Sequence, residues 1–591
     1  MMKRIIALIL SLMMICVLAL VAAEEKTVTA KGDSAIGGKE SLVADVTFDA
    51  EGKITAIKIV ENMETAGIAD PALEKIPAAI IADQSVAVDS VSGATMTSEA
   101  IKMAVSNAIT MAGYDLAAYQ NKVEHEVVKA EDETLTADVV VIGAGGAGLA
   151  AAVQAHQNGA SVLVIEKMDK VGGNTILAGG ALNAVDDRSE TAIANNDSVE
   201  WHYQQTLAGG DFAGDPDLVH VLVSKAWEGV KWLKDMGMEF KPGTFTVLGG
   251  LWPRAHKPVE PVGTGFFKTY MAYIDSHEGI TLKFNTKAEH FITDESGRVV
   301  GVQCRGETGN TVTAMANRGV VCAMGGFGRN IEMRQAFNTQ WATLDASIPS
   351  TNHPGATGDA VKMLMELGAD MVQMGNIQLL PLGDPETGSL SGNIEFGVES
   401  RIFVNKEGKR FVDEGGRRDQ MTAALFEQPD SSLWIIMDSD NYPTGEEKNN
   451  FNESVNSLIA AGRAYKGETL EDLARQIGVN YDNLKAALDD YNAHCLSKEA
   501  DAFGRTLYGT PIDNGPFYAA ARVPTVHHTM GGVRITTEAK VVNERGDVIP
   551  GLYAAGEVVG GIHGTNRLGG NALTDILVFG RIAGENAAAG K

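Results

Sequence analysis

Two short stretches of the sequence hold residue types that could bind phosphate groups. The first is DSVSGATMTS, Asp89 to Ser98, between a run predicted as a strand, Gln84 to Val88, and a helix-type run, Glu99 to Tyr114. Unpaired N–H groups at a helix N-terminus bind oxyanions well, and such a turn would expose them. The residues alone leave an equally good alternative, in which Thr97 or Ser98 only caps the helix.

The second stretch is the glycine motif Gly143-x-Gly145-x-x-Gly148, which includes Gly146. It follows an apolar strand-type run at 139–142, and the next strand, 161–165, ends at Glu166. Glycines here let backbone N–H groups approach a pyrophosphate, and the acid can accept a hydrogen bond from a ribose hydroxyl. The strand, turn, helix and second strand together predict a dinucleotide site.

Two further glycine-rich segments lie far apart in the chain, at 172–184 and at 549–584. Their similarity suggests that one extended cofactor is held by discontinuous segments. Between them, polar helix-type runs such as the one opened by Thr469 predict an inserted domain that covers the cofactor.

Length and charge limit the classes of function. A chain of 591 residues is too long to fold around a single hydrophobic core. Its net charge of −27 argues against nucleic acid as a partner. Three widely spaced cysteines outside residues 1–23 predict no metal site, and no C-x-x-C-H motif for haem occurs. The predicted divisions are a signal peptide at 1–23, a small α+β domain at 24–120, a linker at 121–136, a nucleotide-binding domain at 137–375 and 527–591, and a capping domain at 376–526.

The first residues are typical of a secretory signal. Lys3 and Arg4 precede an apolar run from Ile5 to Val21, and small residues follow. We expect cleavage after Ala23 and an extracytoplasmic location, with an uncleaved anchor as the alternative.

Several motifs together carry a resemblance that covers about residues 135–591. The chain resembles the FAD-dependent fumarate reductase/succinate dehydrogenase flavoprotein superfamily, most closely its secreted flavocytochrome fumarate reductases and urocanate reductases. The fold this implies is α/β, a Rossmann-like FAD-binding domain with an inserted α+β capping domain, preceded by a small α+β FMN-binding domain. The motifs are the Gly143 turn, GGNT at 172–175, VHHTMGG at 526–532, GLYAAGE at 551–557 and HGTNRLGGNA at 563–572.

The resemblance implies a non-covalent FAD. Membrane-bound relatives attach FAD to a histidine in the segment where this chain has Asn174. The FAD-binding residues implied are Gly143, Gly145, Gly146, Gly148, Glu166, Lys167, Gly173, Asn174, Thr175, Gly179, Gly180, Gly325, Gly556, Glu557, Gly570, Asn571 and Ala572.

The N-terminal motif is similar to that of FMN-binding domains in which a flavin transferase esterifies a threonine to FMN phosphate. Here the motif is Asp89-x-x-Ser92-Gly93-Ala94-Thr95, so Thr95 is the predicted acceptor of a covalent FMN, and Thr97 is the less favoured one. Asp89 would assist the transferase. The FMN would relay single electrons from an external donor to FAD.

Relatives in this family reduce a C=C bond conjugated to a carboxylate, with hydride from FAD N5. By resemblance, His527 and Arg567 bind the substrate carboxylate. Arg418 matches the proton donor, and Arg417, one residue earlier, is the alternative. Groups that stabilise the developing negative charge and supply the proton lower the barrier.

An arginine acid needs a relay, because a guanidinium hardly deprotonates in proteins. In relatives a glutamate and an arginine feed the proton donor, and the candidates here are Glu395, Glu399 and Arg401. For each of them a solvated surface charge is an equally good interpretation.

The substrate class is predicted from one position at which this sequence differs from the fumarate reductases. Fumarate reductases have a second carboxylate-binding histidine where this chain has Leu380. Without that cation, a second substrate carboxylate would be poorly compensated. We expect an unsaturated carboxylate with a neutral or aromatic far end, such as urocanate, a cinnamate-like acid or acrylate, rather than fumarate.

Three other functions remain open at this point. They are a fumarate reductase, a flavin dehydrogenase such as a ketosteroid dehydrogenase, and a non-catalytic flavin electron carrier. Arg254, His256 and Lys257 are interpreted as a surface loop with basic residues, with a place in the substrate access path as the alternative.

Overall fold

The computed structural model describes residues 25–34, 38–64, 68–91, 94–125, 128–449 and 451–590. The predicted signal peptide, with its neighbour Glu24, lies outside the described residues, and so do Ser92 and Gly93 of the FMN motif. The chain divides into two compact units, Met1–Glu126 and Val127–Lys591, and each is described by itself. Among the described helices, none is both long enough and apolar enough to cross a bilayer.

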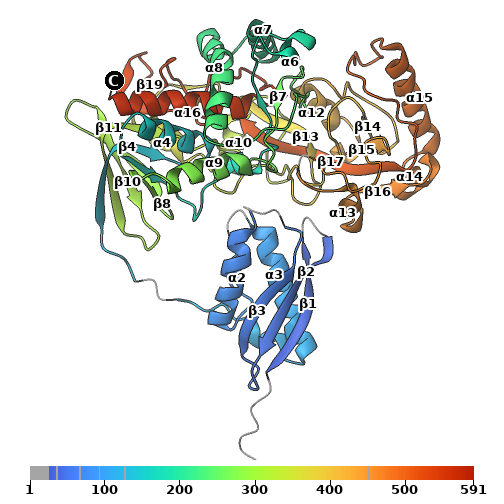
Figure 1. Ribbon diagram of the computed structural model, residues 1–591, viewed down its shortest axis with the longest axis horizontal. Coiled ribbons are helices and arrows are strands. Elements are labelled where there is room, and N and C mark those ends of the chain that lie inside the picture. Colours follow the sequence, from blue (N-terminus) through green and yellow to red (C-terminus); the bar gives the residue numbers. More distant parts are fainter. Residues whose placement is uncertain are drawn as a thin grey trace, which may run out of the picture. The chain divides into compact units, whose positions relative to one another are not determined.

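The N-terminal unit is a three-stranded antiparallel sheet with helices packed on it (Figure 1). The inward-facing residues Leu42, Val46 and Phe48 form a core with Ile101 and Val105 of the second helix. The elements are β1 (Lys26–Ser34), β2 (Gly38–Phe48), β3 (Ile54–Glu61), α2 (Asp70–Asp83), α3 (Thr95–Ala112) and the 3₁₀ turn η1 (Leu116–Tyr119).

The strand predicted at 84–88 does not form. Gln84 ends α2 in a left-handed conformation, with φ of 51°. Its side-chain amide bonds both backbone groups of Ile54, at 2.7 and 2.8 Å, and Val86 N–H donates to the carbonyl of Tyr119 at 2.7 Å. Gln84 through its side chain and Val86 through its backbone thus bond to different segments, and no strand ladder is made.

The second unit is built on a mainly parallel sheet of order β19-β20-β11-β4-β5-β8, with β10 and β9 continuing from β11. Helices α4 and α16 pack against each other and on this sheet (Figure 1). Its strands are β4 (Glu133–Ile142), β5 (Val162–Ile165), β8 (Ile280–Lys283), β9 (Lys287–Thr293), β10 (Val299–Arg305), β11 (Thr311–Cys322), β19 (Lys540–Val542) and β20 (Val548–Ala554).

The carboxyl ends of four parallel strands meet at one edge of this sheet. Ile142 pairs with Ile165 on one side and with Cys322 on the other, and Cys322 pairs with Ala554. Ligands of open α/β sheets bind outside this edge. The three glycine-rich segments follow strands or short turns here, which brings them together although they are far apart in sequence.

A second, antiparallel sheet lies between β11 and β19 in the chain and forms the inserted domain. Its order is β13-β17-β15-β14, with β16 paired to β17. The long strand β17 ends at Thr529 and returns the chain to the first sheet. The elements are β13 (Ile377–Gly383), β14 (Ile402–Val404), α12 (Arg418–Phe426), η2 (Pro429–Ser431), β15 (Leu433–Asp438), α13 (Val455–Ala460), β16 (Tyr465–Gly467), α14 (Leu470–Ile477), α15 (Tyr481–Ser497) and β17 (Phe517–Thr529).

The remaining elements surround the first sheet or connect it to the second. They are α4 (Gly146–Gln157), α5 (Gly173–Leu177), β6 (Leu182–Asn183), α6 (Glu190–Ala194), α7 (Val199–Gly209), α8 (Pro216–Asp235), β7 (Ala255–His256), α9 (Thr264–Asp275), α10 (Ile331–Phe337), α11 (Asp359–Glu366), β12 (Met371–Val372), β18 (Gly532–Val533) and α16 (Asn571–Ala589).

Candidate active site and cofactor cavities

The first cavity, here named the dinucleotide cavity, opens at the turn between β4 and α4. Gly143 has φ of 103°, and an added Cβ would lie 2.4 Å from the carbonyl oxygen of Ala323. At Gly145, by contrast, the nearest atom to an added Cβ is 3.9 Å away, so that position faces open space. Helix α4 begins at Gly146 without a side-chain cap. The N–H of Gly146 donates to Thr175 Oγ1 at 3.3 Å, and the N-terminal turn with the helix dipole fits a pyrophosphate.

One side of this cavity carries a fixed acid. Glu166 accepts hydrogen bonds from the N–H groups of Ala144, at 2.7 Å, and Met168, at 2.8 Å. Burial raises the pKa of Glu166, and these two N–H groups oppose that shift. The carboxylate keeps further lone pairs that can accept from a ribose hydroxyl. The glycine cradle and this acid therefore fit the adenosine diphosphate part of FAD.

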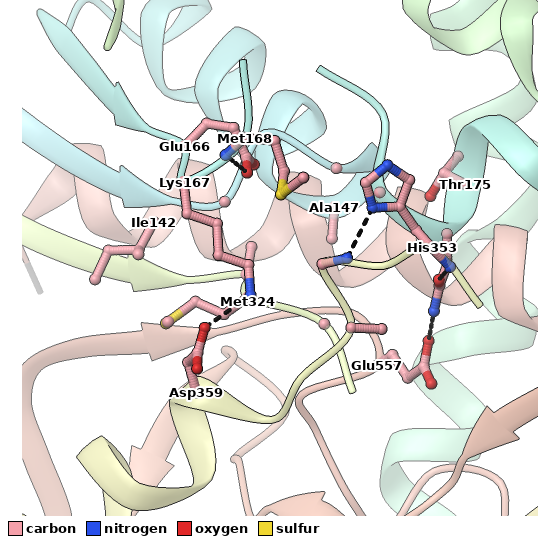
Figure 2. A pocket seen from close by; sticks show the side chains of 18 of the residues that line it. Ile142, Ala147, Glu166, Lys167, Met168, Thr175, Met324, His353, Asp359 and Glu557 are labelled. Carbon is pink, nitrogen blue, oxygen red and sulfur yellow. Dashed lines mark hydrogen bonds and ion pairs between the residues drawn. The ribbon is translucent and has the colours of Figure 1, made fainter. Parts of the chain in front are cut away.

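Charged residues line the same side (Figure 2). Lys167 Nζ lies 2.7 Å from Asp359 Oδ2 and donates to Thr357 Oγ1 at 2.7 Å. Lys287 also pairs with Asp359, at 3.1 Å. These pairs fix the lysines without closing the cavity.

His353 and Glu557 lie on the opposite side of the cavity (Figure 2), and Asn174 bonds to both. Its Nδ2 donates to Glu557 Oε2 at 2.8 Å, and its Oδ1 accepts from the N–H of His353 at 2.7 Å. Burial raises the pKa of Glu557. Burial, with Lys170 and Lys167, lowers the pKa of His353 to about 4. The imidazole is therefore neutral at pH 7.

The sequence analysis missed several residues that line this cavity. No spacing rule marks them, because tertiary folding alone brings their segments to the sheet edge. They are Met168, Thr286, Lys287, Ala288, Ala323, Met324, His353, Gly355, Ala356 and Asp359.

The second cavity, named the arginine cavity, contains the three residues predicted to be catalytic. Arg418 begins α12 and is 5% exposed. Its Nε donates to the carbonyl of Leu248 at 2.9 Å and its Nη1 to Gln378 Oε1 at 3.2 Å. Burial lowers the pKa of Arg418 well below its usual value; the charge of Arg567 acts in the same direction, and Glu395 opposes it.

His527 and Arg567 also line this cavity. Thr351 Oγ1 lies 2.8 Å from His527 Nδ1, which leaves Nε2 for a ligand. Burial and the charges of Arg567 and Arg418 lower the pKa of His527 well below 6.5, so its imidazole is neutral. Burial lowers the pKa of Arg567 to about 10, and its Nε has no hydrogen-bond partner among the described residues. Within the part of the chain that the structure describes, neither Arg418 nor Arg567 forms an ion pair with a carboxylate, so the cavity presents guanidinium charge.

Arg417, the alternative proton donor, is held elsewhere. Its guanidinium pairs with Asp211, at 2.6 and 2.9 Å, and with Asp419, at 2.7 and 3.0 Å. It does not line the arginine cavity. Of the two neighbouring arginines, only Arg418 lines the arginine cavity.

Two of the three candidate relay residues are brought together. Glu395 lines the arginine cavity, and its carboxylate forms an ion pair with Nε of Arg401. Arg401 is fully buried, with its guanidinium carbon 4.2 Å from the centre of the Phe403 ring. Glu399 lines neither cavity, and its backbone carbonyl accepts from Tyr491 Oη at 2.7 Å.

The rest of the arginine cavity is mostly apolar. Leu380, the residue that replaces the second histidine, is 1% exposed and lines this wall. Its apolar neighbours are Phe245, Val247, Leu248, Leu382, Leu390, Phe396, Phe451 and Leu573. A charged group at this end of a ligand would lose hydration without gaining a cation.

The predicted FAD-binding residues divide between the two cavities. Gly143, Gly145, Gly146, Glu166, Lys167, Gly173, Asn174, Thr175, Gly325 and Glu557 line the dinucleotide cavity. Gly179, Gly180, Gly570 and Ala572 line the arginine cavity. Gly148, Gly556 and Asn571 line neither.

These three residues do not line a cavity but lie next to residues that do. A Cβ at Gly148 would lie 1.8 Å from the carbonyl oxygen of Gly143, and one at Gly556 would lie 2.8 Å from Ala147 Cβ. Asn571 is fully buried; it bonds Asn183 at 2.8 Å, His202 at 3.0 Å and Thr206 at 3.1 Å. These bonds fix the side chain of Asn571 at the start of α16, and its contact with FAD stays a prediction.

In the N-terminal unit, Thr95 is exposed at the first position of α3. Thr97 is 3% exposed, and its Oγ1 donates to Glu64 Oε2 at 2.5 Å. Neither Thr97 nor Ser98 caps the helix, because the N-cap is Ala94 and makes no side-chain bond. Asp89 pairs with Lys122 at 2.8 Å.

Arg254 and Lys257 are not in a surface loop, contrary to the interpretation from sequence. They are 1% and 6% exposed. Lys257 Nζ donates to the carbonyl of Gly179, and burial lowers the pKa of Lys257 to about 7. The β6–β7 pairing draws this segment into the interior.

Comparison with known proteins agrees with this architecture. Residues 138–573 match a family described as FAD binding domain, and residues 37–110 match one described as FMN-binding domain. A urocanate reductase of Eggerthella lenta is 35% identical over 577 residues, covering 96% of this chain and 92% of that protein. An open-conformation flavocytochrome c3 fumarate reductase structure has a TM-score of 0.61 and 34% identity, covering 77% of this chain and 78% of that one.

A longer relative is also similar. An NADH:acrylate oxidoreductase of Vibrio harveyi is 37% identical over 610 residues, covering 93% of this chain, and the chain spans 60% of that protein's length. The predicted fold class and the two flavin-binding domains are confirmed. The chain therefore belongs to the FAD-dependent fumarate reductase/succinate dehydrogenase flavoprotein family of oxidoreductases, in the branch of soluble flavocytochrome fumarate reductases and urocanate reductases, and carries an N-terminal FMN-binding domain.

Proposed function

We propose that this protein reduces the C=C bond of an α,β-unsaturated monocarboxylate whose far end is apolar or aromatic. The observation that carries the proposal is the arginine cavity, in which Arg418, Arg567 and His527 face an apolar wall. FAD, when bound non-covalently, supplies the hydride. The lining residues bind the acid, deliver the proton and exclude water.

Arg567 and His527 would hold the substrate carboxylate. The guanidinium of Arg567 has an unpaired Nε, and the neutral imidazole of His527 has a free Nε2. A cation and a hydrogen-bond donor stabilise the negative charge that spreads onto the carboxylate as the β carbon is reduced. Because the site is buried, this stabilisation is stronger than it would be in water.

Arg418 would protonate the α carbon. Its lowered pKa reduces the cost of giving up a proton, which for an exposed arginine is prohibitive. Glu395, in the same cavity, would return a proton to Arg418, and its ion pair with Arg401 would hold its carboxylate in place.

The apolar wall sets the substrate class. Leu380 and its leucine and phenylalanine neighbours would contact the group attached to the β carbon. A second carboxylate there would be buried without a cation, at a cost of several kcal/mol. Cinnamate-like acids and small acrylates therefore fit better than fumarate.

Electrons would come from an external donor through FMN esterified to Thr95 by a flavin transferase. Support comes from the geometry of α3: the Thr95 hydroxyl is accessible, whereas that of Thr97 is buried against Glu64. Export through residues 1–23 and use in anaerobic respiration are part of the same proposal. The first rests on the signal-like sequence, and the second on the family resemblance alone.

Reduced methyl viologen tests the proposal directly. Holoenzyme made with a flavin transferase should oxidise the viologen with cinnamate, urocanate or acrylate, and more slowly with fumarate. A preferred oxidation of a saturated ketosteroid with an added acceptor would favour a dehydrogenase. Accepting and returning electrons without consuming any enoate would favour an electron carrier.

A further inference from the structure

A third cavity, here named the Trp227 cavity, lies outside the flavin and substrate sites. Residues at its wall come from α6, α8, the segment 240–244, Pro253, and β7 with Arg254 before it. Its volume is about 810 Å³, close to the 860 Å³ of the arginine cavity. No residue lines both.

Aromatic rings gather on one wall of this cavity. The ring of His256 lies 5.4 Å from that of Trp227 and 6.4 Å from that of Phe240, measured between centroids. His256 Nε2 bonds the carbonyl of Ala184 at 3.1 Å, which fixes the imidazole. Burial lowers the pKa of His256, so this ring is neutral and offers an apolar face. Such a wall binds a planar ring by stacking.

Cations surround these rings. Lys234 Nζ lies 5.1 Å from the centre of the Trp227 ring and 5.6 Å from that of Phe240. Lys241 is exposed at the rim. The structure shows neither lysine in an ion pair with a described acid.

A buried arginine forms part of the wall. Arg254 is 1% exposed and makes a two-point pair with Asp197, at 2.8 and 3.0 Å, and a bond to Gln205 at 2.6 Å. Its Nη1 has no hydrogen-bond partner among the described residues. A buried guanidinium nitrogen without a partner is costly unless a ligand or water satisfies it.

The acids of the wall do not cancel these cations. Asp197 is occupied by Arg254, and Asp186 lies 3.7 Å from the exposed Arg188. Asn195 Nδ2 and Thr244 Oγ1 both donate to the carbonyl of Pro253, at 3.1 and 2.6 Å. Among the described residues of this wall, the charged side chains without an ion pair are therefore Lys234 and Lys241.

We propose that the Trp227 cavity is a second small-molecule site, which binds an aromatic carboxylate. The ring of the ligand would stack against Trp227, Phe240 and His256, and its carboxylate would meet Lys234 and Lys241. This ligand class is related to the proposed substrates, but the site holds none of the residues placed in the reaction. The inference does not depend on the enzyme being active.

Calorimetric titration of the FAD-loaded protein with 3-phenylpropanoate tests this site, because that acid has no C=C bond to be reduced. The double variant Lys234→Gln/Lys241→Gln should bind one equivalent fewer per chain than the wild type. The matched control is Lys225→Gln/Lys231→Gln, which changes two exposed lysines of α8, the helix that carries Lys234. This control should bind as the wild type does. Trp227→Leu should weaken the same binding event at least tenfold.

Two results would overturn the proposal. One is an equal number of bound equivalents, including none, in the wild type and in the Lys234/Lys241 variant. The other is inorganic phosphate binding at this site as tightly as 3-phenylpropanoate, which would make the aromatic wall irrelevant. Enoate turnover measured on the same preparations reports on the proposed function separately, because it does not depend on this count.

Discussion

Glu395 and Arg401 form a buried ion pair at the edge of the cavity that holds Arg418. The pair turns two of the three relay candidates into one structural unit and leaves Glu399 outside it. Removing one partner of a buried pair is costly, so any test must separate proton delivery from folding.

We expect Glu395→Gln to lower kcat about 10²-fold, because an amide cannot return a proton to Arg418. Glu395→Asp should restore part of the rate and its pH dependence. Glu399→Gln is the control and should keep the wild-type kcat. Steady-state rates with cinnamate and reduced viologen, beside the FAD content of each variant, provide the measurement. An equal decrease of kcat in Glu395→Gln and Glu399→Gln would contradict a specific role of Glu395 in proton delivery.

Leu380→His should shift specificity toward fumarate. A histidine there would donate to the second carboxylate, and a hydrogen bond to a charged group contributes about 1.5–3 kcal/mol, or roughly 10- to 100-fold in the fumarate/cinnamate ratio of kcat/KM. Leu380→Asn controls for added polarity. An unchanged ratio in the histidine variant would show that Leu380 does not face the substrate.

Lys257 should make stability depend on pH. Its folded pKa of about 7 lies below the unfolded value of 10.5, so the unfolded chain binds more protons between those values. Stability therefore rises with pH across this window, by at most about 1.4 kcal/mol per pH unit for one group.

Lys257→Met should flatten this rise between pH 7 and 9, as measured by urea unfolding at each pH. Lys231→Met, an exposed lysine of α8, should leave the slope unchanged. The same slope in Lys257→Met and the wild type would mean that Lys257 keeps an ordinary pKa in the folded protein.

Thr95→Ala should abolish covalent FMN, because the exposed hydroxyl at the start of α3 is the only one of the two threonine hydroxyls open to a transferase. Thr97→Ala should retain it. Flavin fluorescence on denaturing gels, after co-expression with a flavin transferase, distinguishes the two variants. Labelling of Thr95→Ala but not of Thr97→Ala would reverse the assignment.

The fold was predictable where local pattern and chemistry agree. The glycine turn at Gly143 and the acid Glu166 have fixed places in a strand-turn-helix unit, so their spacing alone located the dinucleotide cavity. The segment 84–88 was wrongly predicted as a strand because its valines suit one, whereas Gln84 and Val86 bond to Ile54 and Tyr119, which are distant in sequence and belong to different segments.

The site was predictable only in part, for a related reason. A motif shows that residues cluster but not which of them touch a ligand. Asn571 directly follows Gly570, which lines the arginine cavity, yet its side chain bonds Asn183 and Thr206 inside the protein. His353 and Asp359 reach the dinucleotide cavity by tertiary folding, and Arg254 and Lys257 are drawn inward by the β6–β7 pairing. No periodicity marks either event.

The central claim is that Arg418, and not its neighbour Arg417, gives the proton to the substrate. The decisive measurement is the rate at which an enoate reoxidises the reduced holoenzyme in a single turnover, in Arg418→Ala and in Arg417→Ala. We predict that viologen reduces the flavins of both variants, that Arg417→Ala is reoxidised by cinnamate as the wild type is, and that Arg418→Ala is slower by about 10²-fold or more. Reoxidation of Arg418→Ala at the wild-type rate would contradict the account.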